Sequence, residues 1–162
     1  MSIILWIDPG TTTTGFAIIE SSADINLVDF GVISTTPKIA DSLKLLEIWQ
    51  DIAALLDRYN PDLIVVEKLF FNNNITTGIQ VAQARGVVLY EAAKKWIQSL
   101  EYTPLQVKKA ITGNGRANKS QLQNAIKMLM RLETIPKPDD AADAIWLAYM
   151  WYLNLGNMWL PR

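Results

Sequence analysis

Apolar residues in the first part of the chain occur in short runs and then in one longer, helical pattern. The short runs cover residues 3–7, 15–20 and 25–34. Their lengths, their β-branched residues and the turn residues between them predict three antiparallel strands. Residues 39–59 carry apolar side chains at helical spacing, and Asn60-Pro61 stops the pattern, which predicts a helix.

The rest of the chain alternates between strand-like and helix-like segments. We expect strands at residues 63–66 and 101–103, and helices at residues 77–98, 105–111, 119–132 and 139–153. Three antiparallel strands followed by this alternation predict an α/β fold around a mixed sheet. A chain of 162 residues without internal repeats or linkers is expected to form a single domain over residues 1–162.

Four carboxylates occupy positions where such a fold places functional groups. Asp8 follows the first apolar run and Glu67 follows the run at 63–66, and open α/β sheets bind their ligands beyond such strand ends. Asp140 and Asp143 are three residues apart and share one face of the final helix. Structural alternatives exist, because Asp8 could bond its own turn and the helical pair could interact with the positive helix start.

The composition restricts the chemistry that these residues can perform. The chain contains no cysteine and no histidine, so thiolate nucleophiles, imidazole bases and ordinary zinc sites are excluded. If the four carboxylates converge, they form an oxygen-only site suited to Mg²⁺, with Mn²⁺ as a substitute. Two such ions about 4 Å apart promote the hydrolysis of phosphodiesters.

Charge is segregated along the chain despite a net charge of −1. Residues 85–131 hold nine basic and two acidic residues, whereas residues 1–84 hold four basic and ten acidic residues. This asymmetry predicts a surface for a polyanion, although lysines on the wet face of a helix are the structural alternative. No apolar run of about 18 residues and no signal-like start occur, so we expect an intracellular protein outside membranes.

Several motifs in order resemble those of the RuvC-type Holliday-junction resolvases, a family with the ribonuclease H-like fold. They lie at residues 7–16, 66–70, 82–86, 106–108, 113–120 and 140–144. The resemblance implies a five-stranded mixed sheet flanked by helices and a magnesium-dependent homodimeric endonuclease. Such an enzyme resolves four-way DNA junctions by paired symmetric nicks in recombination and repair. It implies two Mg²⁺ ions per site, held by Asp8, Glu67, Asp140 and Asp143.

The resemblance also implies DNA contacts. Lys108 and Lys119 match lysines that act near the scissile phosphate, and Phe70 matches an aromatic residue linked to unstacked bases at the crossover. The remaining candidate DNA contacts are Phe71, Arg85, Lys109, Arg116 and Ser120. Ordinary core or dimer packing is the alternative for the two phenylalanines. A branch-migration motor complex is a further partner that the resemblance allows, and a cytoplasmic, nucleoid-associated location follows from it.

Two features depart from the family pattern, and other functions stay open. Trp6 stands where the family carries glycine, on the face of Asp8 by strand alternation, so the core beneath the site must be repacked. Residues 146–159 are rich in Trp and Tyr, which suits core packing or an enlarged interface.

The alternative functions are those of a ribonuclease H-like nuclease for branched DNA or RNA–DNA hybrids, and of an inactive junction-binding protein. Residues 8–12 also resemble the phosphate loop of actin-like ATPases, which need two domains.

Overall fold

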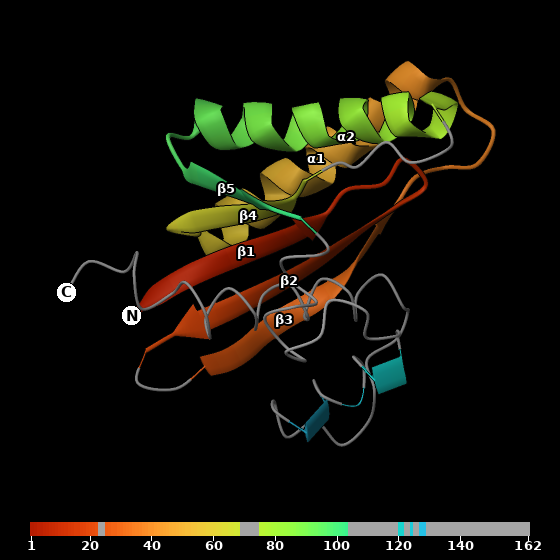
Figure 1. Cartoon of the computed structure of the whole chain (residues 1–162). Coiled ribbons are helices and arrows are strands. Elements are labelled where there is room, and N and C mark those ends of the chain that lie inside the picture. The colour runs from red at the N-terminus through yellow and green to blue at the C-terminus, as the bar shows by residue number, and fades with distance from the viewer. Residues whose placement is uncertain (23–24, 69–74, 104–119, 122–123, 125–126, 129–162) are drawn as a thin grey trace.

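The computed structural model describes residues 1–22, 25–68, 75–103, 120, 121, 124, 127 and 128. Five strands form one mixed sheet with the order β3-β2-β1-β4-β5 (Figure 1). The strands are β1 Ser2–Asp8, β2 Thr13–Ser21, β3 Ile25–Ser34, β4 Leu63–Glu67 and β5 Gln98–Tyr102. The first three pair antiparallel, whereas β4 and β5 run parallel to β1. The predicted α/β fold with a mixed sheet is therefore confirmed.

Two helices, α1 Asp41–Tyr59 and α2 Ile75–Lys94, cover the same face of the sheet (Figure 1). α1 buries Ile48, Ile52 and Leu56, which recur every four residues and so form one stripe. The core on this face joins residues of both helices with alternate residues of the strands. Its strand residues are Leu5, Ile7, Ile18, Ile33, Ile64 and Val66.

The second face of the sheet is buried as well. Ile4, Trp6, Ile19 and Val65 alternate with the residues that face the helices, and each is at most 1% exposed. Burial on both faces explains why β1 is continuously apolar from Ile3 to Ile7, directly before its last residue, Asp8. That strand is also central, because it is hydrogen-bonded to β2 on one side and to β4 on the other.

The junction between α2 and β5 differs from the sequence prediction. The helix ends at Lys94 instead of residue 98, and the strand begins at Gln98 instead of residue 101. The amide of Ile97 donates to the carbonyl of Ala92 at 3.0 Å, which closes the helix end. Trp96 occupies the left-handed position of this turn with φ = 59°, a position where glycine is usual.

The later predicted elements fall mostly outside the described residues. This applies to the helices expected at residues 105–111 and 139–153 and to the tail at 146–159. Residues 120, 121, 124, 127 and 128 are helical, in agreement with the helix predicted at 119–132. Within the described part of the chain, no helix is both long and apolar enough to cross a membrane.

Candidate functional site

Asp8 and Glu67 lie at the ends of two neighbouring parallel strands. The register of β1 and β4 pairs Ile7 with Val66, and the acidic residues follow one step later in each strand. Because Ile7 and Val66 face the helices, the two carboxylates point to the opposite face of the sheet. Neighbouring strands are about 4.8 Å apart, so these half-buried side chains lie at adjacent strand ends.

The turn after Asp8 is held by threonine side chains. The Thr14 hydroxyl donates to the carbonyl of Gly10 at 2.7 Å and also accepts from the amide of Gly10 at 3.1 Å. The Thr35 hydroxyl donates to the carbonyl of Thr11 at 2.8 Å, which ties the turn to the end of β3. A Cβ atom on Gly10 would lie 2.0 Å from the carbonyl oxygen of Thr13, so no larger residue fits. The turn therefore fixes the backbone directly behind Asp8.

Tyr102, the last residue of β5, lies beside Glu67 on the side away from Asp8. It pairs with Glu67 in the register of β4 and β5, and its carbonyl accepts from the Lys68 amide at 2.7 Å. Its ring stacks with Trp6, with ring centroids 6.2 Å apart and planes 29° apart. Trp6 therefore has an aromatic partner on the face of the acidic pair. Tyr102 itself was missed, because its place depends on a strand whose register the sequence does not indicate.

The structure also places two of the predicted DNA contacts. Arg85 lies in α2, its side chain is 19% exposed, and its guanidinium forms an ion pair with Glu101 of β5. Ser120 is exposed and helical. The other predicted residues lie outside the described part of the chain: Phe70, Phe71, Lys108, Lys109, Arg116, Lys119, Asp140 and Asp143. Among the described residues, no group of three or more acidic side chains that could hold a metal ion occurs.

The chemistry of the described pair nevertheless fits a hard divalent cation. Both groups are carboxylates, which are the oxygen donors that Mg²⁺ and Mn²⁺ prefer. Asp8 and Glu67 are the last residues of β1 and β4. Each of these strands is hydrogen-bonded to a neighbour on both sides, so the backbones of the two residues are firmly placed. Two half-buried carboxylates at adjacent strand ends repel one another, and a bound cation relieves this repulsion.

Comparison with known families decides which fold and chemistry these features belong to. A family model described as "Crossover junction endodeoxyribonuclease RuvC" matches residues 4–150. The chain belongs to the RuvC family. The matched range contains both strand-end carboxylates and the whole described sheet, apart from the first residues of β1. Membership of the RuvC family implies dependence on a divalent metal ion.

Individual RuvC proteins support the same assignment. The crossover junction endodeoxyribonuclease RuvC of Halothermothrix orenii is 46% identical over 144 residues, which are 88% of this chain and 87% of that protein. The RuvC of Caldicellulosiruptor saccharolyticus is 42% identical and covers 96% of this chain and 95% of its own. The structure of Thermus thermophilus RuvC with a Holliday junction substrate superimposes with a TM-score of 0.87 at 26% identity, covering 94% of each chain. The ribonuclease H-like fold is therefore confirmed.

Proposed function

We propose that this chain is a Holliday junction resolvase, an endonuclease that cuts four-way DNA junctions in recombination and repair. The observation that carries the proposal is the match of residues 4–150 to the family of crossover junction endodeoxyribonucleases. The adjacent Asp8 and Glu67 support it, because they supply two of the carboxylates that the reaction needs at the predicted end of the sheet.

The proposed metal centre consists of Asp8, Glu67, Asp140 and Asp143, and we assign Mg²⁺ to it, two ions per site, with Mn²⁺ as a substitute. Such ions lower the pKa of the attacking water and neutralise charge on the phosphate oxygens. Asp8 and Glu67 supply oxygen ligands from the ends of two central strands, so little reorganisation of the protein is needed when the cation and the DNA bind. Asp140 and Asp143, in the helix that the sequence predicts at residues 139–153, complete the proposed ligand set.

The basic segment is proposed to hold the DNA. Lys108 and Lys119 neutralise charge beside the scissile phosphate, while Lys109, Arg116 and Ser120 contact the backbone, so binding weakens as salt rises. Phe70 and Phe71 stack on unpaired bases at the crossover. Arg85 is a further proposed DNA contact, and its ion pair with Glu101 joins α2 to β5.

A homodimer is part of this proposal. A four-way junction has approximate two-fold symmetry, and an isologous dimer presents two equal sites to opposing strands, which gives paired nicks that can be ligated. We propose one nuclease domain for each chain over residues 1–162, working in the cytoplasm and on the nucleoid. A motor complex that drives branch migration is the proposed partner that delivers the junction.

Substitution of Asp8 by Asn tests the assignment. Asn keeps the size of the side chain but removes its charge, so cation-dependent cutting of a synthetic four-way junction should be lost while junction binding is retained. Asp51→Asn, at an exposed position on α1, is the matched control and should cut normally. Retained cutting by Asp8→Asn would refute the metal-site assignment.

The choice of substrate separates the proposal from its alternatives. Wild-type protein is offered four-way junctions, flapped DNA and an RNA–DNA hybrid, each with Mg²⁺ or Mn²⁺. Preferred cutting of the four-way junction at symmetric positions is the expected result. Preferred cutting of the hybrid or the flap would indicate a different nuclease of the same fold, and binding without cutting would indicate a junction-binding protein.

A further inference from the structure

Trp6 and Tyr102 reach toward one another across β4. Trp6 lies on β1 beside Val65, and Tyr102 lies on β5 beside Glu67, with β4 between these two strands. The outer strands of such a group of three are about 9.6 Å apart, yet the ring centroids are only 6.2 Å apart. The two side chains therefore lean inward over β4 and form a bridge on the face that carries the acidic pair.

The bridge lies directly beside Glu67. Strand alternation places Val65 and Glu67 on the same face of β4, and Val65 is completely buried. The stacked rings occupy the space on the side of Val65, so they limit the directions in which the Glu67 side chain can lie. Trp6 also stands two residues before Asp8 on its own strand, on the same face, so the stacked pair includes strand neighbours of both acidic residues.

We propose that the Trp6–Tyr102 bridge is a positioning device for the metal centre. It limits the space open to the Glu67 side chain and keeps the Glu67 carboxylate directed toward Asp8. This inference rests on the proposed function, because it assigns the two aromatic residues to the cation site of that enzyme. In this proposal neither residue contacts the reacting atoms, and both act through Asp8 and Glu67.

We assign this role to the ring of Trp6. The residue is 1% exposed, and its Nε1 atom has no hydrogen-bond partner among the described residues. The contact that the structure does show is the stacking with Tyr102. Phenylalanine retains an aromatic ring at this position and lacks the donor, so Trp6→Phe is the conservative variant, whereas leucine removes the stacking.

Binding of Mn²⁺ alone, measured by isothermal titration calorimetry on the full chain, tests the bridge. Trp6→Leu and Tyr102→Leu should each weaken Mn²⁺ binding by about tenfold. Loss of a residue that supports the metal ligands lowers metal affinity by about 10–100-fold, and we expect the lower end of this range. Trp6→Phe should stay within about twofold of wild type, since the aromatic contact persists. The double Leu variant should lose no more than either single one, because both remove the same contact.

Ile18→Ala is the control for a general loss of stability. Ile18 is fully buried on the helix-covered face, away from the bridge, so this variant should be destabilised and still bind Mn²⁺ like wild type. Junction binding without metal should be unchanged in all variants, and excess Mn²⁺ should restore cutting by the Leu variants. Wild-type affinity in Trp6→Leu, or an equal loss in Ile18→Ala, would overturn the inference.

The same measurements distinguish this inference from the proposed function. If wild-type protein neither binds Mn²⁺ nor cuts four-way junctions, the proposed function fails, and the bridge has no site to support. If wild-type protein does both and the Leu variants bind Mn²⁺ equally well, only the bridge is refuted.

Discussion

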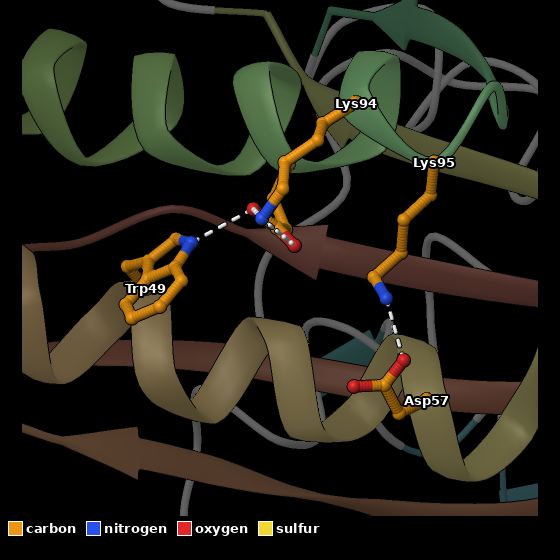
Figure 2. A network of polar contacts seen from close by, with 5 residues as sticks. Trp49, Asp57, Lys94 and Lys95 are labelled. Carbon is orange, nitrogen blue, oxygen red and sulfur yellow. Dashed lines mark hydrogen bonds and ion pairs between the residues drawn. The ribbon is translucent and has the colours of Figure 1, made fainter.

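Glu91 is the best place to test the energetics of this fold, because it is a carboxylate buried between the two helices. Its side chain, on α2, is only 2% exposed. Its Oε2 atom accepts a hydrogen bond from Nε1 of Trp49 on α1 at 2.7 Å and lies 3.3 Å from Nζ of Lys94. Figure 2 shows Trp49 and Lys94, whose contacts in this network are drawn as dashed lines.

Substitution of Glu91 by Ala should cost about 3 kcal/mol of unfolding free energy. A hydrogen bond to a charged group contributes about 1.5–3 kcal/mol, and its loss also leaves the Trp49 donor without this acceptor. The Lys94 ion pair adds only about 0.5 kcal/mol, because the Lys94 side chain is 51% exposed. For a chain of this size the melting temperature should fall by about 6–12 °C.

The same two helices provide the matched control. Lys95 of α2 forms an ion pair with Asp57 of α1, and the Asp57 side chain is 70% exposed (Figure 2). Asp57→Ala should therefore cost less than about 1 kcal/mol. Urea unfolding followed by circular dichroism measures both variants. Equal losses for Glu91→Ala and Asp57→Ala would refute the reasoning that burial gives the Glu91 contact its strength.

Three further predictions concern the turn after β1, a glycine of α2 and the ionisation of one tyrosine. Gly10→Ala should reduce both stability and junction cutting, because its Cβ would meet the Thr13 carbonyl oxygen at 2.0 Å and displace the turn behind the acidic strand end. Gly86→Ala, with nothing within 4 Å of its Cβ, should instead stabilise α2 by about 0.5–1 kcal/mol in urea unfolding. The hydrogen bond from the Tyr59 hydroxyl to the Asp29 carboxylate, followed by burial, raises the pKa of Tyr59 above its ordinary value of 10.0. Folding favours the protonated hydroxyl of Tyr59, so its hydrogen bond to Asp29 contributes fully to stability below pH 10.0, and the contribution is lost as the pH rises through the raised pKa. Thermal melts at alkaline pH should show this loss in wild type and not in Tyr59→Phe.

Each of these last predictions has a clear contrary outcome. Equal stability of Gly10→Ala and Gly86→Ala would show that the turn adjusts to a Cβ atom without cost. For Tyr59, an identical alkaline loss of stability in wild type and Tyr59→Phe would assign that loss to other groups.

The positions of the strand-end carboxylates could be predicted from the sequence because the signal is local. Burial on both faces makes β1 apolar from Ile3 to Ile7 and β4 apolar from Leu63 to Val66, so each apolar run ends visibly just before the acidic residue. Because β1 and β4 are parallel neighbours, the two residues lie at the same end of the sheet. The α/β fold class followed from the same pattern of short and long apolar segments.

The end of α2 and the start of β5 could not be predicted in the same way. No glycine or proline marks the helix end, and Trp96 takes the left-handed conformation instead. β5 is an edge strand with a mostly exposed sequence, so its pairing with β4 determines it more than its own apolar pattern does. The contact between Trp6 and Tyr102 depends on that pairing, and therefore only the structure reveals it.

The central place of β1 and β4 has a consequence for how the enzyme would lose activity. Each strand is hydrogen-bonded to a neighbour on both sides, so neither can separate without breaking two ladders. Amides in such strands exchange with solvent through opening of the whole fold, whereas edges and turns exchange through local opening. The geometry of Asp8 and Glu67 should therefore persist under mild denaturing conditions until the sheet itself unfolds, and inactivation should coincide with global unfolding.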